Sequence, residues 1–172
     1  MVEKMDTFIR SKESTPIISI IMPVFNREKL IEQAINTVLD QSYQNWELII
    51  VNNNSNDFTC EVVEKYCLLD ARIRLVNEEK PGVRFARNFG ISVATGRYVA
   101  FLDSDDIWNE FKLEVQLEHM LQRSSALSCT NYRPFKDKEG SRIYKTVRVV
   151  SKEVRFKDLL RTCSIGTSSV VI

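Results

Sequence analysis

The feature that most restricts the fold is the alternation of short apolar runs with segments of helical period. Each run has four to seven residues, which suits a buried strand, and in the segments between them apolar side chains recur every three or four residues. Because neighbouring parallel strands need a crossover helix, the order β-α-β-α-β-α-β predicts a mostly parallel sheet with helices on both faces, an α/β fold of Rossmann-like type. The predicted strands are residues 16–22, 47–51, 73–76 and 97–102, and the predicted helices lie within residues 28–41, 59–67 and 83–95.

The pattern changes after the fourth predicted strand. A fourth helix, with apolar side chains from Leu113 to Leu121, precedes two strand-like segments around a hairpin-like turn, a short helix and a final apolar strand. The first fifteen residues have no period, so we expect a flexible leader at 1–15 and one domain at 16–172. The later segments are strands at 126–135 and 142–150 joined by a turn at 136–141, a helix at 157–161 and a strand at 168–172.

Three predicted helix ends have candidate caps. Asn26 precedes the first helix, and Asp57 and Thr59 precede the second; each side chain has an oxygen that can accept a backbone N–H. Gly96 follows the third helix, where a residue without a Cβ can adopt the left-handed conformation. We therefore expect Asn26, either Asp57 or Thr59, and Gly96 to mark these three ends.

Composition and charge argue against several classes of protein. A net charge of +1 provides no general basic field, so we expect no nucleic-acid partner. The longest apolar run, residues 17–25, is far shorter than the ~20 residues of a membrane-spanning helix, and the polar N-terminus does not resemble a signal peptide. The single histidine, His119, cannot build a multi-histidine metal site. We expect a cytoplasmic protein with no transmembrane segment. Such a protein could still associate peripherally with the inner face of a membrane.

Polar segments follow three of the predicted strands. They occupy residues 23–28, 52–57 and 103–106. The carboxyl ends of parallel strands meet at one edge of a sheet, and ligands of such sheets bind beyond that edge. The sequence therefore predicts a ligand site formed by these three segments.

The third segment places Asp103, Asp105 and Asp106 within four residues, directly after an apolar strand. One interpretation is a solvated turn in which an aspartate caps the next helix. Another is a Mg²⁺ or Mn²⁺ site, because these ions prefer oxygen ligands and would offset the repulsion among the acids. A third is a phosphatase of the haloacid dehalogenase type, with the first Asp as nucleophile and the second as acid/base. That chemistry needs a second acidic pair, and only the isolated Glu153 and Asp158 follow residue 139.

Taken together, these segments resemble the nucleotide-binding part of family 2 glycosyltransferases, which have the GT-A fold. The matching stretches are SIIMPVFNREKLIEQAINTVLDQSYQNWELIIV, PGVRFARNFGISVATGRYVAFLDSDDIW and, more weakly, IGTSSVVI. The resemblance implies an inverting, metal-dependent hexosyltransferase of polysaccharide biosynthesis. Its donor would be a UDP- or GDP-linked sugar, and its acceptor a saccharide or a lipid-linked hydroxyl compound.

The resemblance also implies donor-binding residues. Pro23, Val24 and Phe25 match the family segment that lies along the nucleobase, with Phe25 where an aromatic ring stacks. Without the resemblance, Phe25 could equally be a core aromatic. Arg84 or Arg87 would lie near the base or the diphosphate, although Arg87 taken alone is as readily a surface charge.

The same resemblance also implies a role for each aspartate of the acid cluster. Asp103 corresponds to the ribose-side acid of the family's D-x-D motif, and Asp105 to the ligand of Mn²⁺ or Mg²⁺. Asp106 could share the metal. Asn53 departs from the family, which has an acid there that accepts a hydrogen bond from the nucleobase. An asparagine keeps one carbonyl acceptor and adds an N–H₂ donor, so a contact with the base edge is still expected.

The second departure concerns the catalytic base. In the family this Asp or Glu comes from an acceptor-binding half, and no residue after Asp106 matches it before the chain ends at Ile172. We therefore expect residues 16–172 to be a GT-A donor-binding domain that is incomplete at its C-terminal side, with the base beyond Ile172 and little activity of its own. The alternative function is a non-catalytic module that binds a nucleotide sugar.

Overall fold

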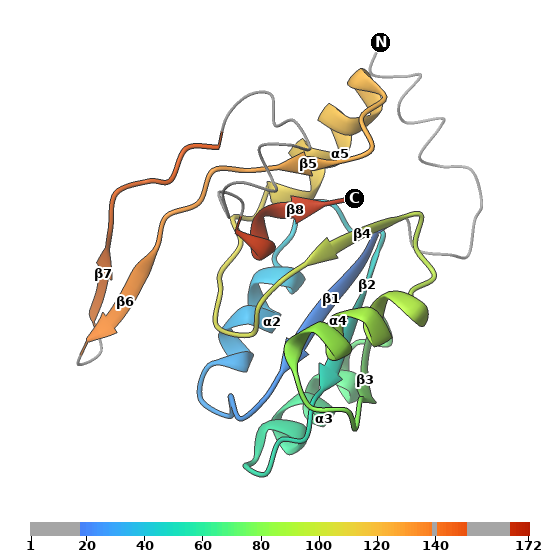
Figure 1. Cartoon of the computed structure of the whole chain (residues 1–172), viewed down its shortest axis with the longest axis vertical. Coiled ribbons are helices and arrows are strands. Elements are labelled where there is room, and N and C mark those ends of the chain that lie inside the picture. Colours follow the sequence, from blue (N-terminus) through green and yellow to red (C-terminus); the bar gives the residue numbers. More distant parts are fainter. Residues whose placement is uncertain (1–17, 139–140, 151–165) are drawn as a thin grey trace.

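The structure is a computed structural model, and it describes residues 18–138, 141–150 and 166–172 (Figure 1). The predicted leader at 1–15 and the predicted helix at 157–161 lie outside these ranges. Within them no helix is long and apolar enough to cross a membrane. The strands are β1 (Ile18–Val24), β2 (Trp46–Asn52), β3 (Ile73–Asn77), β4 (Tyr98–Phe101), β5 (Ser128–Cys129), β6 (Phe135–Lys138), β7 (Ser141–Tyr144) and β8 (Val170–Val171). The helices are α2 (Ile31–Leu39), α3 (Thr59–Leu69), α4 (Val83–Ser92) and α5 (Lys112–Arg123), and a 3₁₀ turn, η1, covers Thr167–Ser169.

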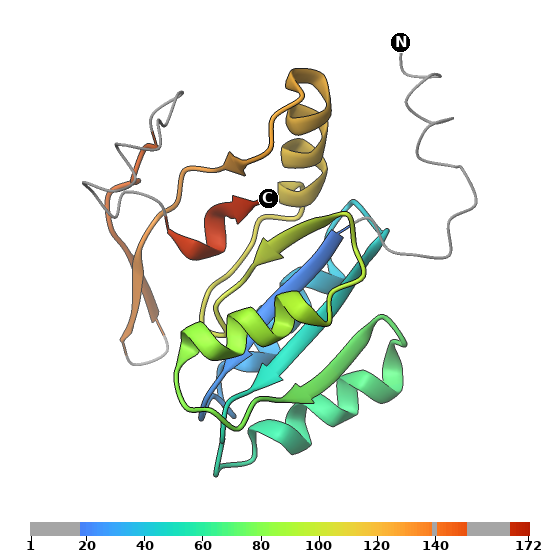
Figure 2. The same ribbon diagram turned by 45° about the vertical axis from the view of Figure 1, so that its right-hand side comes forward.

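The main sheet has six strands in the order β3-β2-β1-β4-β8-β5, which confirms the predicted mostly parallel α/β fold. Strands β1 to β4 are parallel, and β8 inserts antiparallel between β4 and β5. Strands β6 and β7 form a separate two-stranded ribbon that extends away from the sheet (Figures 1 and 2). The central position of β1 places the segment after it in the middle of the carboxyl edge.

Helices cover both faces of the sheet, as predicted. Helix α4 packs on one face, and α2 lies on the opposite face, as the two views show (Figures 1 and 2). Strand β1 contacts the helices on both faces of the sheet, because alternate side chains of a pleated strand point to opposite faces. Ile20 and Met22 belong to the core that includes α2, α3 and α5, whereas Ile21 packs with Ala86 of α4. Every residue of β1 is buried for this reason.

Helix α4 approaches the sheet closely because it carries a glycine at the contact. A Cβ added to Gly90 would lie 2.5 Å from Cγ2 of Ile21 and 3.2 Å from Cγ2 of Val51. Any larger residue would push the helix off the sheet or force the β-branched side chains to move. The position of α4 matters for function, since its first turns carry Val83 and Arg87 to the carboxyl edge.

None of the three predicted caps occupies its expected position. Asn26 does not cap α2; it lies in the left-handed region with φ of 51°, and its Oδ1 accepts the backbone N–H of Asn56 at 2.9 Å. Helix α4 ends at Ser92, so Gly96 is not its cap. Gly96 instead passes so close to β1 that an added Cβ would lie 2.6 Å from the backbone nitrogen of Ser19. Neither candidate occupies the N-cap position of α3, which is Phe58, although Asp57 Oδ1 accepts the N–H of Thr59, the first residue of the helix, at 3.1 Å.

The later strands differ from the prediction in length. Only Ser128–Cys129 of the expected strand 126–135 joins the main sheet, and the rest leads into β6. The ladder of β6 and β7 runs to Lys138 and Ser141, so the predicted turn at 136–141 is too long. The expected strand 168–172 begins with η1, because Ser169 donates its N–H to Gly166 O at 3.0 Å instead of joining a ladder.

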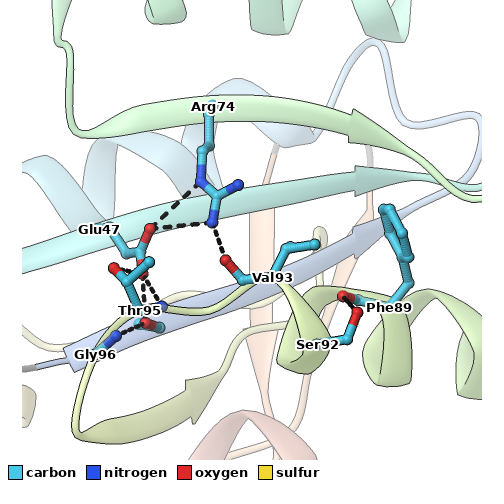
Figure 3. A network of polar contacts seen from close by, with 8 residues as sticks. Glu47, Arg74, Phe89, Ser92, Val93, Thr95 and Gly96 are labelled. Atoms are coloured by element: carbon cyan, nitrogen blue, oxygen red, sulfur yellow. Dashed lines mark hydrogen bonds and ion pairs between the residues drawn. The ribbon is translucent and has the colours of Figure 1, made fainter.

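A polar network ties the α4–β4 connection to the sheet near the amino ends of its strands (Figure 3). Oε1 of Glu47, on β2, accepts hydrogen bonds from Ser19 Oγ at 2.6 Å and from Thr95 N at 2.7 Å. Its Oε2 pairs with Nη2 of Arg74, on β3, at 3.2 Å. Gly96 N donates to Ser19 Oγ at 2.8 Å, which closes the network. One nearly buried carboxylate thus joins three strands and a loop.

The network controls the ionisation of Glu47. Burial by itself would raise the pKa of this carboxyl, but the bonds from Ser19 and Thr95 and the charge of Arg74 outweigh burial and lower the pKa below its usual value. A lowered folded-state pKa means that the stability contributed by Glu47 is fully present above the unfolded pKa, about 4.3, and is lost as the pH falls through the folded pKa.

We predict that Glu47→Gln lowers the free energy of unfolding by about 2 kcal/mol at pH 7, because the amide cannot accept all of these bonds and removes the ion pair with Arg74. Urea unfolding of both proteins between pH 7 and pH 3 measures this, and the difference should shrink at the acid end. Glu64→Gln, on the exposed side of α3, is the matched control and should change stability by less than about 0.5 kcal/mol. A difference that does not depend on pH would contradict the assigned role.

Candidate functional site

The polar segments that follow β1 and β2 are joined by hydrogen bonds at the carboxyl edge of the sheet. Asn26 N donates to Ser55 Oγ at 3.1 Å, and Asn56 N donates to Asn26 Oδ1 at 2.9 Å. Asn53 N donates to Val24 O at 2.9 Å. The acid turn after β4 reaches the same place, as the cavities below show. The prediction that these segments meet at one edge is therefore confirmed.

A cavity of about 360 Å³, called here the smaller cavity, lies between these segments and the start of α4. It collects seven of the nine residues that the sequence predicted for donor and metal binding. The two that do not line it are Arg84 and Asp106. The smaller cavity is lined by Pro23, Val24, Phe25, Arg27, Asn53, Val83, Arg87, Asp103, Ser104 and Asp105.

Phe25 lines this cavity. Its side chain is 54% exposed, whereas the preceding Val24 is 2% exposed and belongs to the core. The alternative that Phe25 is a core aromatic is therefore wrong. Arg84 points elsewhere: it is exposed, and its guanidinium carbon lies 4.5 Å from the ring centroid of Phe85. Of the two predicted arginines, only Arg87 lines the cavity.

Two of the three acids have arginine partners. Asp103 Oδ1 pairs with Arg87 Nη2 at 2.6 Å, and both side chains are partly buried. Nε of Arg87 is buried and has no hydrogen-bond partner, so this residue keeps an unused donor beside the cavity. Asp105 Oδ2 lies 3.5 Å from Arg27 Nη2, and both side chains are largely exposed. An exposed pair at this distance holds Asp105 only weakly.

The third acid is held by a residue that the sequence did not single out. Ser168 Oγ donates to Oδ2 of Asp106 and accepts the backbone N–H of Asp103 at 2.9 Å. Nε1 of Trp108 donates to Ser168 O at 2.7 Å and fixes the serine in turn. Ser168 belongs to the stretch IGTSSVVI, whose weak resemblance to the family was the only available signal.

The environment of Asp106 favours its protonated form. Burial raises the pKa of this carboxyl, and the negative charges of Asp103 and Asp105 raise it further, against the opposing effect of the Ser168 hydroxyl. Asp106 also faces away from the smaller cavity and lines a second one. The three acids thus occupy three different environments although they lie on one turn, in which Asp106 N donates to Asp103 O at 3.0 Å.

The Asn53 amide is occupied by the loop that leads into α4. Its Nδ2 donates to Glu78 O at 2.8 Å and to Lys80 O at 2.9 Å, and its Oδ1 accepts the N–H of Gly82 at 2.7 Å. Gly82 directly precedes α4 and has φ of 123°, a conformation that favours glycine. The structure explains the departure from the family's acid, because a carboxylate would face two carbonyl oxygens. The predicted bond to a nucleobase stays a prediction, and one lone pair of Oδ1 remains for it.

A larger cavity, of about 880 Å³, adjoins the smaller one and shares Asp103 and Asp105 with it. Its other walls come from α2, the start of α5, the β6–β7 ribbon and η1. Lys112 lines it and is nearly buried, with Nζ bonded to Gln116 Oε1 and 4.2 Å from the ring centroid of Trp108. Burial lowers the pKa of Lys112 to about 7. The sequence did not predict this cavity.

The donor atoms of the site fit a metal that a bound phosphate helps to coordinate, as the following contacts indicate. Among the described residues, no three His, Cys, Asp or Glu side chains converge on a point that a metal ion could occupy. Mg²⁺ and Mn²⁺ need fewer protein ligands when substrate phosphates complete the coordination, and one or two carboxylates are usual. Asp105, which lines both cavities and has only a weak partner, fits such a role. Asp106, with its Oδ2 on Ser168, is less available.

The fold and the site define an α/β ligand-binding domain of the GT-A type. The sequence pattern described as "Glycosyl transferase family 2" matches residues 19–169. The chain therefore belongs to this family. The membership excludes the haloacid dehalogenase alternative, whose strand-end acids serve a different reaction.

Two relatives match nearly the whole chain. The glycosyltransferase TuaG of Bacillus subtilis, whose name assigns it to teichuronic acid biosynthesis, is 41% identical over 158 residues, which are 91% of this chain and 62% of TuaG. The Escherichia coli enzyme WfgD, named as a UDP-Glc:α-D-GlcNAc-diphosphoundecaprenol β-1,3-glucosyltransferase, is 39% identical over 91% of this chain and 60% of its own length. The chain thus spans about three fifths of these relatives.

Solved structures agree with the fold. TarS of S. aureus (residues 1–349), in complex with UDP, superposes with a TM-score of 0.60 and 29% identity over 64% of this chain and 33% of TarS. The mannosyltransferase PcManGT of Pyrobaculum calidifontis, in complex with GDP-Man and Mn²⁺, gives a TM-score of 0.62 over 74% of this chain and 41% of its own. At 22% identity the second likeness concerns the fold alone.

We predict that Asn53→Asp destabilises the chain by about 3 kcal/mol at pH 7, because two donated hydrogen bonds are lost and a charge is placed against carbonyl oxygens. The new carboxyl should have a raised pKa, so the loss should be smaller at pH 4.5, where it is protonated, than at pH 7. Urea unfolding at both pH values measures this. Asn88→Asp, on the exposed side of α4, is the control. Equal, small losses for both variants would contradict the role given to the Asn53 amide.

Proposed function

We propose that this chain is the donor-binding part of an inverting, metal-dependent glycosyltransferase. It would move a hexose from a UDP- or GDP-linked sugar to a hydroxyl group of a saccharide or lipid-linked acceptor, in cell-surface polysaccharide biosynthesis. The observation that carries the proposal is the position of Asp105, which lines both the smaller and the larger cavity. A carboxylate at this junction lies where a donor diphosphate and an acceptor would meet.

The names of the relatives support the substrate classes. TarS, at 29% identity, has been solved with UDP and with UDP-GlcNAc. WfgD is named for a diphosphoundecaprenol-linked acceptor, and TuaG for teichuronic acid. A hydrophobic acceptor of this kind resides in a membrane. We propose that the protein acts in the cytoplasm, at the inner face of that membrane.

The nucleoside would occupy the smaller cavity. The half-exposed ring of Phe25 offers a stacking surface for the base, beside the buried Pro23 and Val24. Asp103 uses one carboxylate oxygen for Arg87 and can accept a ribose hydroxyl with the other. Arg87 orients Asp103 and brings positive charge to the cavity wall, where a diphosphate would be attracted. Asp103 and Arg87 already hold each other in place before a ligand arrives.

The diphosphate would lie near Asp105, which we propose as the ligand of Mn²⁺ or Mg²⁺, with Asp106 as a second candidate. When bound, such an ion neutralises the charge that develops on the leaving diphosphate. Arg27, which pairs weakly with Asp105, can then turn its guanidinium toward a phosphate oxygen. The chain has no glycine-rich phosphate loop, so these side chains carry the phosphate contacts.

The acceptor would enter the larger cavity. Its aromatic residues Trp108, Tyr132 and Tyr144 suit the apolar faces of a sugar, and its volume suits more than one sugar ring. Within the described ranges, the carboxylates that line it are Asp103, Asp105 and Asp106, and each has a partner. We propose that the general base comes from another segment of the protein. The alternative, a non-catalytic module that binds nucleotide sugars, shares the same donor site and differs only in turnover.

We predict that binding of UDP or GDP depends on Mn²⁺ or Mg²⁺, because a diphosphate adds negative charge beside Asp103 and Asp105, whose own charges already occupy Arg87 and Arg27. Titration calorimetry with metal and with EDTA measures this. Asp105→Ala should weaken metal-dependent binding at least tenfold, and Asp40→Ala, an exposed acid outside both cavities, should not change it. Equal affinity for nucleotide in metal and in EDTA would end the metal hypothesis.

We also predict that residues 1–172 bind donor but transfer sugar near background. General-base catalysis contributes roughly 10²–10⁴ in rate, and a carboxylate that holds a metal is a poor base. Release of UDP from UDP-glucose, measured with and without a lipid-diphosphate-linked sugar as acceptor, tests this. Acceptor-dependent turnover by the 172-residue chain would show that the base is inside it.

A further inference from the structure

The segment that contains the β6–β7 ribbon and the residues on either side of it differs in charge from the rest of the molecule. Residues 133–148 contain six lysines and arginines and two acids, a net charge of +4, although the whole chain carries only +1. The rest of the chain is therefore net negative. The ribbon also projects beyond the six-stranded sheet in both views (Figures 1 and 2). A positive charge is thus concentrated on a protruding element.

One face of the ribbon is turned toward the larger cavity, although Tyr144 on that face is still 56% exposed. Phe135 and Tyr144 are paired in the ladder, their ring centroids are 6.1 Å apart, and both line the larger cavity. Arg142 lies on the same face, two residues from Tyr144, and its Nη2 donates to Oε1 of Gln33 on α2 at 2.5 Å. This inner face therefore packs toward the sheet.

The opposite face is uncovered in the described part of the chain. Because side chains alternate along a strand, the pair Lys136 and Ile143 points away from the inner face. Lys145 continues the ladder through its N–H bond to Pro134 O at 2.7 Å and shares this side. Ile143 is 54% exposed, both lysines are exposed, and neither forms an ion pair within the described ranges. We call Lys136, Ile143 and Lys145 the outer face.

We propose that the outer face docks the protein on the surface of an anionic lipid bilayer. An apolar side chain between two lysines matches such a surface, because the ammonium groups meet lipid phosphates while the aliphatic group and the lysine stems enter the interface. Near an anionic bilayer each lysine contributes about fivefold in affinity. Nucleic acid fits less well, since the outer face has no aromatic side chain for base stacking.

Docking in this orientation has a consequence for the larger cavity. The inner face of the same ribbon lines that cavity, so a ribbon one layer thick would separate the cavity from the bilayer. A lipid-linked acceptor would then need to extend only its head group to reach the acids. This consequence rests on the proposed function, whereas docking itself depends only on the charge and exposure of the outer face.

The experiment is co-sedimentation of the 172-residue chain with vesicles, without nucleotide. We expect binding to mixed phosphatidylglycerol–phosphatidylcholine vesicles, little binding to pure phosphatidylcholine, and weakening by salt. Lys136→Ala combined with Lys145→Ala should weaken binding about 25-fold. Lys29→Ala combined with Lys65→Ala removes the same charge from exposed positions elsewhere and should leave binding unchanged. Ile143→Ser should weaken the binding that remains at high salt.

Two further measurements distinguish a loss of docking from a loss of folding or of donor binding. Thermal unfolding verifies that each variant is folded, and UDP titration should give the same affinity for all of them, so a failure of docking is separate from a failure of the donor site. Equal binding to neutral and anionic vesicles would overturn the proposal. The same holds if the control pair weakens binding as much as the outer-face pair, or if a DNA oligonucleotide binds as tightly as the anionic vesicles.

Discussion

The mutual repulsion of three carboxylates on one turn is the constraint on which the carboxyl edge depends. The fold meets it by giving each acid a different partner from a different part of the chain. Arg87 comes from α4, Arg27 from the segment after β1, and Ser168 from η1. These partners also fix the directions of the acids, so that one turn serves two cavities.

The edge of the sheet at the amino ends of its strands also holds a carboxylate that needs partners, in this case a nearly buried one. There Glu47 is nearly buried, and it is satisfied by hydroxyl and amide donors and by Arg74. The contacts join β1, β2 and β3 to the loop that follows α4. Because α4 is held at this end by the loop and along its length by the Gly90 contact, its first turn reaches the other edge in a defined place. The position of Arg87 beside Asp103 thus depends on interactions at both edges.

Asn53 shows how a departure from a family motif is explained by its neighbours. Its two amide hydrogens bind carbonyl oxygens of the loop before α4, which a carboxylate could not do. The adjacent Asn54 donates to Glu79 O in the same loop at 2.9 Å. The asparagine run is therefore a clamp on the segment that starts α4. The remaining lone pair of the Asn53 oxygen stays available for the proposed contact with a nucleobase.

The sequence by itself determined the layered α/β fold, the parallel order of the first four strands and the edge at which the polar segments meet. These follow from periodicity, which depends on near neighbours in the chain and on the two-residue and 3.6-residue repeats. The same reasoning brought seven predicted site residues to one cavity. Only the tertiary structure decided that Arg84 and Asp106 face elsewhere, that Gly96 serves a close approach instead of a helix end, and that Ser168 holds the acid turn. The physical reason is that the places of Asp106, Gly96 and Ser168 depend on contacts between residues far apart in sequence, whose distances no local pattern encodes.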